Sequence, residues 1–350
     1  MSAVVADATS LAGDFPELRG ARIAVIVPAY KVVAHIGTVV GTVPAFVERI
    51  YVVDDACPVG SGAVAEALQD PRVRVLFNAH NLGVGGAVMN GYRQAIEDGF
   101  DILVKVDGDG QMDPAMMADL VRPLLDSEAD YAKGNRFYDL TYISRMPGMR
   151  LLGNSVLSLL SKASTGYWDV MDPTNGYTAL SADVASRIDF SKISSRYFFE
   201  TDLLFRLNTV RAVVVDVPMD ARYGDEVSNL KISRVATEFM WKHMRNVSKR
   251  IFYSYFLRDF SIASIELVLG VALFAFGAVF GSYSWFKSTS TGVETGAGTV
   301  MLAALPVIFG MQLLLAFTSY DIARVPRKVI GRPALWRKLM SSGAGTRVRA

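Results

Sequence analysis

Two long runs without a charged residue dominate the C-terminal part of this 350-residue chain. The first, Leu267–Phe286, has 20 residues and the second, Thr295–Tyr320, has 26. As α-helices, runs of this length can cross the roughly 30 Å hydrocarbon core of a bilayer. Core helices of soluble proteins usually keep a polar face, and these runs carry no charge at all. We therefore predict two transmembrane helices within residues 260–322, joined into a hairpin by the short linker Lys287–Glu294.

Basic residues flank this hairpin unevenly. The linker holds only Lys287, whereas the outer flanks hold Lys242, Arg245, Lys249, Arg250 and Arg258 before the first span and Arg324, Arg327, Lys328, Arg332, Arg337 and Lys338 after the second. Lysine and arginine are enriched on the cytoplasmic side of membrane proteins. We therefore expect a multi-pass protein of the inner or plasma membrane with both termini in the cytoplasm, and a basic cytoplasmic tail at 323–350.

The remaining bulk features exclude some classes of protein. Residues 1–20 contain Asp7, Asp14 and Glu17 and no long apolar core, so we predict an N-terminal tail and no signal peptide. The single cysteine, Cys57, rules out an intramolecular disulfide. A formal net charge of +2 gives no case for a nucleic-acid partner.

Residues 21–230 alternate strand patterns with helical patterns. Apolar runs predict strands at Arg22–Tyr30, Ile50–Ala56, Val73–Asn78 and Asp101–Asp109. Helical patterns fill Gly85–Glu97 and the stretch between the first strand and Arg49. This alternation predicts an α/β domain with a mainly parallel sheet that is covered on both faces. Such sheets bind ligands at the carboxyl ends of their strands.

Polar and special residues gather at those predicted strand ends. Pro28–Tyr30, Asp54–Asp55 and Asp107–Asp109 each close one strand, so we expect them on one edge of the sheet. No G-x-G-x-x-G sequence directly follows the first strand, and there is no Walker A sequence. These absences disfavour a classical dinucleotide site and a P-loop.

The stretch VKVDGDGQMDP, residues 104–114, places three acids behind an apolar run. Carboxylates as close as Asp107 and Asp109 repel one another unless a cation lies between them. Mg²⁺ and Mn²⁺ accept oxygen ligands from a few protein groups together with substrate phosphates. We therefore predict that Asp107, Asp109 and Gln111 hold Mg²⁺ or Mn²⁺, with a solvated turn as the alternative. Asp113, just before Pro114, is predicted to be the N-cap of the next helix.

A series of short motifs occurs in a characteristic order along residues 22–225. The motifs are VIVPAY, VVDDA, NLGVGGAVMNGYRQA and VDGDGQMDP, followed by KGNRF, DPTNGYTAL, YFFETDLL and RYGDEVSNLK. The first four resemble the family 2 glycosyltransferases with the Rossmann-like GT-A fold. The later four resemble the group of dolichol-phosphate mannose synthase and the bacterial polyprenyl-phosphate glycosyltransferases, whose membrane-anchored members also carry two C-terminal spans.

The resemblance implies an enzyme that transfers a sugar from a UDP- or GDP-linked donor to a polyprenyl phosphate at the cytoplasmic face, with a metal ion and with inversion. The implied nucleotide-binding residues are Pro28, Ala29, Tyr30, Asp54, Asp55, Asn81, Gly83, Gly85 and Asp107. Among these, Gly83 and Gly85 would let the backbone approach the nucleotide closely. Asp109 and Gln111 would hold the metal on the diphosphate.

The resemblance also assigns the acceptor side. Arg136 and Arg222 would bind the acceptor phosphate, because guanidinium binds phosphate through two hydrogen bonds, and Lys231 and Arg234 would assist. Asp172 would orient the acceptor or take a proton from it. The implied catalytic set is Asp109, Asp172, Arg136 and Arg222. Glu200 would orient the sugar, or else simply lie at a helix N-terminus.

Residues 231–259 mix aromatic with basic side chains, which predicts interfacial juxtamembrane helices on the inner leaflet. A simple amphipathic linker is the alternative. Two other functions stay open: a polysaccharide-chain glycosyltransferase of the same fold, and a membrane-tethered nucleotide-sugar binder without turnover. The former normally carries Q-x-x-R-W and more spans, and neither is found here. The sequence names neither the sugar nor the nucleotide, and it leaves a homo-oligomer open.

Overall fold

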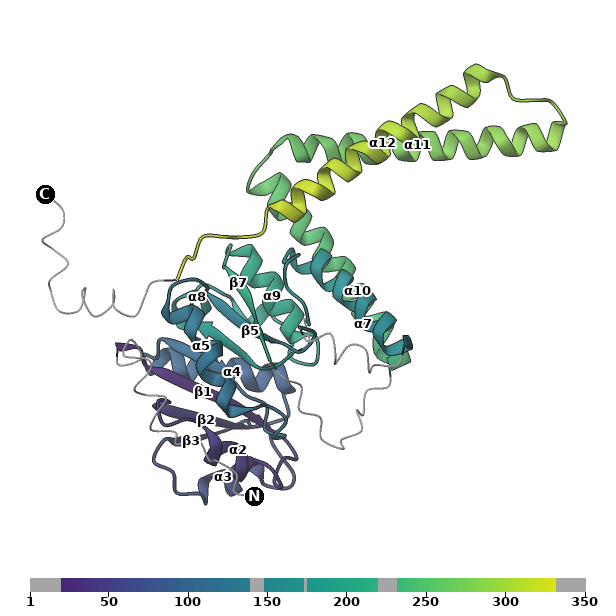
Figure 1. Ribbon diagram of the computed structural model, residues 1–350. Coiled ribbons are helices and arrows are strands. Elements are labelled where there is room, and N and C mark those ends of the chain that lie inside the picture. Colours follow the sequence, from purple (N-terminus) through teal and green to yellow (C-terminus); the bar gives the residue numbers. More distant parts are fainter. Residues whose placement is uncertain (1–19, 139–147, 173–174, 220–231, 332–350) are drawn as a thin grey trace, which may run out of the picture. The chain divides into compact units, whose positions relative to one another are not determined.

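The structure, a computed structural model, describes residues 20–138, 148–172, 175–219 and 232–331 (Figure 1). The chain divides into two compact units. The larger unit contains the chain up to Asn246 and again from Pro326, and the hairpin unit is Val247–Val325. Each unit is described by itself below.

A seven-stranded sheet forms the centre of the larger unit, in the order β3-β2-β1-β4-β6-β5-β7. The strands β1, β2, β3 and β4 pair with one another in parallel. Strand β6 runs antiparallel to both of its neighbours, β4 and β5. The predicted mainly parallel sheet is therefore confirmed. The strands are β1 (Ile23–Ala29), β2 (Arg49–Asp54), β3 (Val73–Phe77), β4 (Ile102–Lys105), β5 (Tyr131–Asn135), β6 (Thr178–Ser181) and β7 (Val214–Pro218).

Helices cover both faces of this sheet. Val25 and Val27 of β1 belong to the apolar core that includes residues of α2 and α5. The opposite face, with Ile26, packs on α4 so closely that a Cβ atom at Gly91 would lie 2.6 Å from Ile26 Cγ2. The helices of this unit are α2 (Ile36–Thr42), α3 (Ser61–Glu66), α4 (Val84–Glu97), η2 (Pro114–Met116), α5 (Met117–Leu125), α7 (Gly148–Thr165), α8 (Ala182–Ala185), η3 (Phe190–Lys192), α9 (Phe199–Thr209) and most of α10 (Ile232–Phe252).

Local sequence explains where several elements end. The helical stretch predicted to reach Arg49 stops at Thr42, because Pro44 disfavours the helical conformation of Val43, which is extended. Strand β4 ends at Lys105, earlier than the predicted Asp109. The predicted N-cap is confirmed, since the Asp113 carboxylate accepts a hydrogen bond from Ala115 N.

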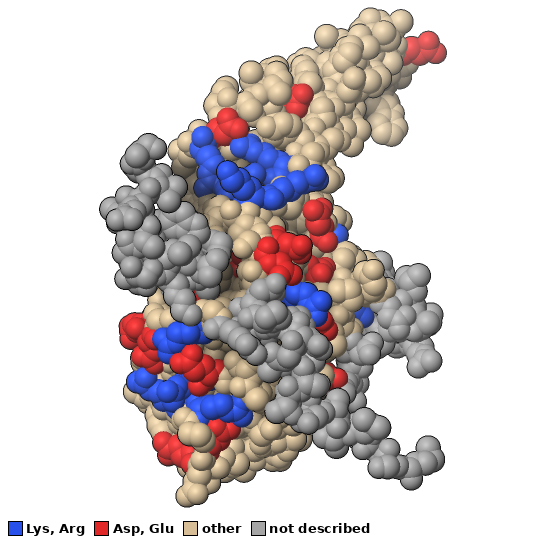
Figure 2. Space-filling model, turned by 60° about the vertical axis from the view of Figure 1, so that its left-hand side comes forward, with Lys and Arg blue, Asp and Glu red and all other residues tan. Residues whose placement is uncertain are grey.

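The hairpin unit contains two helices long and apolar enough to cross a membrane, α11 (Ile262–Thr291) and α12 (Ala297–Ala323). Figure 2 shows the hairpin surface as almost entirely uncharged. Glycines let the two helices approach closely: a Cβ atom at Gly277 would lie 2.7 Å from Ala303 O, and one at Gly310 would lie 2.5 Å from Phe274 N. The two predicted spans therefore pack together as a helical hairpin.

A buried polar cluster closes the end of the hairpin where the chain enters and leaves it. The segment before α11 includes a short π-helix, η4 (Tyr253–Leu257). Arg250 binds Asp321 of α12 through two hydrogen bonds of 2.6 and 2.8 Å, and the Tyr255 hydroxyl donates to the same carboxylate. Because breaking a buried ion pair is costly, this cluster fixes the start of the first span against the end of the second.

The chain returns to the larger unit directly after the hairpin. Ile330 N and Gly331 N donate hydrogen bonds to the Asp130 carboxylate, with distances of 3.1 and 2.7 Å to Oδ1. Ile330 and Gly331 of the predicted basic tail are thus bound to the larger unit. The rest of that tail, after Gly331, and the predicted N-terminal tail before Gly20 lie outside the described residues.

Candidate active site

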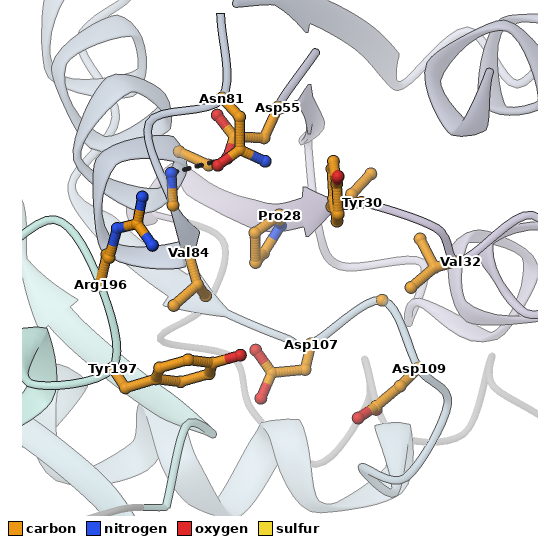
Figure 3. Close-up of a pocket in the computed structure, with 14 residues that line it drawn as sticks. Pro28, Tyr30, Val32, Asp55, Asn81, Val84, Asp107, Asp109, Arg196 and Tyr197 are labelled. Atoms are coloured by element: carbon orange, nitrogen blue, oxygen red, sulfur yellow. Dashed lines mark hydrogen bonds between the residues drawn. The ribbon is translucent and has the colours of Figure 1, made fainter. Parts of the chain in front are cut away.

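A cavity of about 410 Å³ lies at the carboxyl ends of β1, β2 and β4 (Figure 3). Ala29 pairs with Asp54 and Ile26 pairs with Lys105, so these three strands end side by side. The predicted gathering of polar residues at one sheet edge is confirmed. The described residues that line the cavity are Pro28, Ala29, Tyr30, Val32, Asp55, Asn81, Gly83, Val84, Ala87, Asp107, Gly108, Asp109, Arg196 and Tyr197.

The adjacent acids Asp54 and Asp55 have different positions. Asp54 accepts hydrogen bonds from Cys57 N and Gly62 N, both at 2.7 Å, and it is not among the described residues that line the cavity. This geometry favours a structural role for Asp54 over the predicted nucleotide contact. Asp55 lines the cavity and accepts from Leu82 N and Gly83 N at 2.8 Å each, so it also shapes the loop before α4.

The glycines at the start of α4 allow a close approach between two backbone segments. Gly83 has a φ of +85°, and a Cβ atom there would lie 2.7 Å from Ser195 O. A Cβ atom at Gly85 would lie 2.5 Å from Phe199 Cβ. Gly83 lines the cavity, whereas Gly85 is covered by the chain just before and within α9. The need for glycine at these positions is therefore explained in part by packing within the protein and not only by the approach of a nucleotide.

Asp107 is paired with a buried cation that was not among the predicted site residues. Lys105 Nζ lies 2.7 Å from Asp107 Oδ1 and 3.6 Å from Glu200 Oε1, and the Lys105 residue is only 1% exposed. Burial lowers the pKa of Lys105, but the Asp107 and Glu200 carboxylates raise it to a net value above the usual one. Lys105 is therefore a fixed positive charge behind the cavity wall. The signal was a single lysine inside the apolar run ILVKV.

Asp109, with Asp107, places a second carboxylate on the cavity wall. Asp109 Oδ1 accepts a hydrogen bond from Gln111 N at 3.0 Å, and Gln111 is not among the described lining residues. Among the described residues, no group of three or more His, Cys, Asp or Glu side chains could hold a metal by itself. Two carboxylates on an open cavity suit a hard divalent cation that takes its other ligands from water and substrate phosphates. The residues present therefore fit Mg²⁺ or Mn²⁺ bound together with a substrate.

Arg136 and Asp172 lie together, bound to each other. Arg136 Nε and Nη2 donate to the Asp172 carboxylate at 2.7 and 2.9 Å, and the Asp172 side chain is fully buried. Burial raises the pKa of Asp172, but the hydrogen bonds from Arg136 and the charges of Lys133 and Arg136 together bring the pKa below its usual value. A carboxylate of low pKa is a poor proton acceptor, so the geometry favours an orienting role for Asp172.

The surroundings of Asp172 add a second buried lysine. Lys133 Nζ donates a hydrogen bond to Asp172 O, and burial lowers the pKa of Lys133 against the opposing effect of Asp172 and Asp216. Asp172 itself has a φ of +45°, a left-handed conformation that is uncommon outside glycine. Strained backbone of this kind is often found at functional sites.

Several predicted residues cannot be placed. Arg222 and Lys231 lie outside the described residues, and so does the side chain of Arg234, whose backbone is in α10. The cavity also contains residues that the sequence did not reveal. Arg196 and Tyr197 come from the loop before α9, and the hydroxyl of Tyr197 points toward Asp107 (Figure 3). No local pattern marks them, because only the fold brings this distant loop to the cavity.

Comparison with known proteins identifies the family. The model of glycosyl transferase family 2 matches residues 24–188. The chain is 32% identical over 204 residues to the polyprenol monophosphomannose synthase of Mycolicibacterium smegmatis, covering 57% of this chain and 76% of that protein. This chain belongs to the family 2 glycosyltransferases. It is also 32% identical over 210 residues to the undecaprenyl-phosphate mannosyltransferase of Micrococcus luteus, covering 57% of this chain and 82% of that protein.

Solved structures confirm the GT-A fold of this glycosyltransferase. The glucosyl-3-phosphoglycerate synthase of Mycobacterium tuberculosis in complex with UDP matches with a TM-score of 0.53 and 18% identity, over 71% of this chain and 87% of that one. The same enzyme with Mn²⁺ and UDP-glucose matches with a TM-score of 0.51 and 18% identity, over 69% and 83%. At this identity the likeness concerns the fold alone. The family membership makes this chain an enzyme, so the prediction of a glycosyltransferase is confirmed.

Glu200 of this glycosyltransferase should make the stability of the fold depend on pH. Burial raises the pKa of Glu200 from 4.5 to about 7. Between these values the folded protein binds a proton that the unfolded chain has released, so the contribution of Glu200 favours folding at low pH and is lost as the pH rises toward 7. We expect the stability of the wild type relative to Glu200→Gln to fall by roughly 1–3 kcal/mol between pH 5 and pH 8.

Thermal unfolding of the detergent-solubilised protein across this pH range measures the effect. Glu97→Gln, at an exposed position of α4, is the matched control and should follow the wild type at every pH. If the unfolding temperatures of the wild type and Glu200→Gln changed in parallel with pH, the raised pKa of Glu200 would be contradicted.

Proposed function

We propose that this enzyme transfers one sugar from a nucleoside diphosphate sugar to the phosphate of a polyprenyl phosphate, at the cytoplasmic face of a membrane. The observation that carries the proposal is the combination of an acidic cavity at the sheet edge with a two-helix hairpin in one chain. The named activities of the two relatives at 32% identity support the same acceptor class.

The donor would occupy the cavity between the ends of β1 and β4. Pro28, Ala29 and Tyr30 would lie against the base. Asp55 would accept hydrogen bonds from the nucleoside, and Asn81 would donate or accept them. Asp54 is left out of this set because backbone amides already occupy both of its oxygens. The loop held by Asp55 then sets the width of the donor site.

Asp109 and Asp107 would hold a divalent cation on the donor diphosphate. When bound there, Mg²⁺ or Mn²⁺ neutralises charge that builds on the leaving diphosphate. The solved Mycobacterium tuberculosis enzyme of the same fold contains Mn²⁺ together with UDP-glucose, which supports a divalent cation with a nucleotide-sugar donor in this fold. Lys105 would hold the Asp107 carboxylate in place, because the Lys105 ammonium is buried and lies 2.7 Å from it.

In the reaction, an oxygen of the acceptor phosphate forms a bond to the anomeric carbon while the bond from that carbon to the diphosphate breaks. The nucleoside diphosphate leaves with the electron pair, and attack from the opposite face gives inversion. An acceptor phosphate is anionic near neutral pH, so no strong base is needed. We propose that Arg136, oriented by Asp172, helps to bind this phosphate, and that Arg222, together with Lys231 and Arg234 of the juxtamembrane segment, contributes.

The membrane orientation is a further part of the proposal. The chain before the hairpin and the chain after it both belong to the larger unit, which supports the same side for both ends. We expect a cysteine at Glu294, introduced in a Cys57→Ser background, to react with a membrane-impermeant thiol reagent in intact cells. A cysteine at Lys192 in the same background, on an exposed part of the larger unit, should react only after permeabilisation. The reverse pattern would overturn the orientation.

Transfer of labelled sugar into a lipid extract tests the donor side. Purified protein in liposomes with undecaprenyl phosphate and a divalent cation should incorporate label from one or a few members of a panel of UDP- and GDP-sugars. The panel also identifies the sugar and the nucleotide. No incorporation from any donor, with the protein folded and the metal present, would contradict the proposed function.

A further inference from the structure

The cavity has an unbalanced charge for a site that should take a diphosphate. Three carboxylates line it, those of Asp55, Asp107 and Asp109. Among the described lining residues, Arg196 is the one lysine or arginine. A diphosphate is itself anionic and needs cationic or N–H partners along its length. The guanidinium of Arg196 therefore provides the positive charge that the other described lining residues lack.

Arg196 lies at the N-terminus of α4. A Cβ atom at Gly83 would lie 3.0 Å from Arg196 Cγ, so the aliphatic part of Arg196 packs on the residue that precedes α4. Figure 3 shows the guanidinium beside this helix start and on the same side of the cavity as Asn81. The N-terminus of a helix carries a partial positive charge. The Arg196 guanidinium and the start of α4 therefore both make the electrostatic potential positive at one place on the cavity wall.

The loop that carries Arg196 is held by hydrogen bonds at the two residues that precede it. Ser195 O accepts a hydrogen bond from Gly86 N at 3.0 Å, and Ser194 N donates to Asp202 Oδ2 at 2.9 Å. The other oxygen of Asp202 accepts from Asn246 Nδ2 of α10 at 3.1 Å, and both of these residues are 1% exposed. Because the backbone of this loop is already fixed, a ligand that binds Arg196 does not have to order the loop.

An ordinary surface ion pair is the competing explanation for Arg196. Among the described residues, Glu238 of α10 is an acid whose pKa the charge of Arg196 helps to lower, although the hydrogen bond from Lys242 lowers it most. The Glu238 carboxylate, however, is bound by Lys242 at 2.6 Å, and it is exposed to solvent. Exposed pairs of this kind contribute little, so Glu238 does not account for an arginine placed on the cavity wall.

We infer that Arg196 binds the diphosphate of the donor, and that Asp202 with Asn246 positions it there. The inference rests on the proposed function in one respect, namely that the donor is a nucleoside diphosphate sugar. It adds a phosphate-binding arginine on the side of the cavity away from Asp109 (Figure 3). It also gives the buried part of α10 a role in donor affinity, through the hydrogen bond from Asn246 to Asp202.

Calorimetric binding of UDP and GDP, each compared with its nucleoside, tests this assignment. For the nucleotide that the wild type binds, Arg196→Ala should raise the Kd of the nucleoside diphosphate at least about tenfold and leave the Kd of the nucleoside unchanged. Arg196→Lys should recover part of the loss. Lys192→Ala removes an exposed cation four residues earlier and should behave as the wild type.

Asn246→Ala tests the positioning role. It should raise the Kd of the nucleoside diphosphate several-fold without changing that of the nucleoside, and Asn246→Asp should be worse because it places a second carboxylate beside Asp202. General destabilisation would weaken both ligands equally and would overturn the positioning role. Equal diphosphate affinity in Arg196→Ala and the wild type, or a wild type that binds neither UDP nor GDP, would overturn the inference. A wild type that binds a nucleoside diphosphate but forms no glycolipid would overturn the proposed acceptor and not Arg196.

Discussion

Replacing Asp109 with asparagine should lower the rate of sugar transfer by about 10³-fold. The substitution keeps the size of the side chain and removes its charge, which the bound cation needs. A cation on a leaving diphosphate is worth several kcal/mol in the transition state, and each 1.36 kcal/mol corresponds to a factor of ten in rate. The assay is the initial rate of glycolipid formation at saturating metal. Mn²⁺ binding in the presence of the nucleoside diphosphate, followed by electron paramagnetic resonance, should weaken in parallel.

Asp113→Asn is the matched control for this prediction. Asp113 lies in the same acidic stretch, but its carboxylate caps the helix that starts at Pro114. Asparagine is about as good an N-cap as aspartate, so activity and stability should stay close to those of the wild type. If Asp109→Asn transferred sugar at the wild-type rate with Mg²⁺ or Mn²⁺ present, Asp109 could not be a metal ligand.

Replacing Lys105 with methionine should destabilise the fold and nearly abolish activity. Methionine fills much of the same volume, but it leaves Asp107 and Glu200 facing each other without the cation that lies 2.7 and 3.6 Å from them. Loss of one partner from a buried ion pair costs about 3–5 kcal/mol, and we expect the lower end because Asp107 is partly exposed. A displaced Asp107 should also reduce transfer by about 10²-fold, because small misplacements at a reacting site have large effects.

Denaturant unfolding of the solubilised protein and the initial rate of transfer measure these two effects. Lys192→Met is the control, because it breaks an exposed pair with Asp189 and should leave the stability close to that of the wild type. Equal stability of the two variants would show that Lys105 is not needed as a buried counter-charge. Full activity of Lys105→Met would show that the position of Asp107 set by Lys105 is not needed for sugar transfer.

The sheet edge could be predicted because it depends on local patterns. Continuous apolar runs identify β1, β2 and β4, and parallel strands must place their carboxyl ends on one edge. The gathering of Asp54–Asp55 and Asp107–Asp109 at one edge of the sheet follows from that geometry. The hairpin was equally accessible, since its length and lack of charge do not depend on tertiary contacts.

The sequence could not predict which of two neighbouring residues lines the cavity and which one binds the backbone. Asp54 and Asp55 are adjacent in the sequence, yet only the fold turns the first to the backbone of α3 and the second to the cavity. Arg196 reaches the cavity because the loop before α9 packs on Gly83, a contact across more than a hundred residues. Arg136 was predicted as a phosphate ligand, and the structure adds its bond to Asp172, which a motif cannot reveal.

The mass of the lipid product tests the acceptor, which is the central claim. Purified protein is incubated with the nucleotide sugar that it uses, a divalent cation and either polyprenyl phosphate or the matching polyprenol without phosphate. We predict a product whose mass equals polyprenyl phosphate plus one sugar residue, no product from the polyprenol, and almost none from Asp109→Asn. Sugar transfer to the polyprenol at the same rate, or a product that carries a growing sugar chain, would contradict the account.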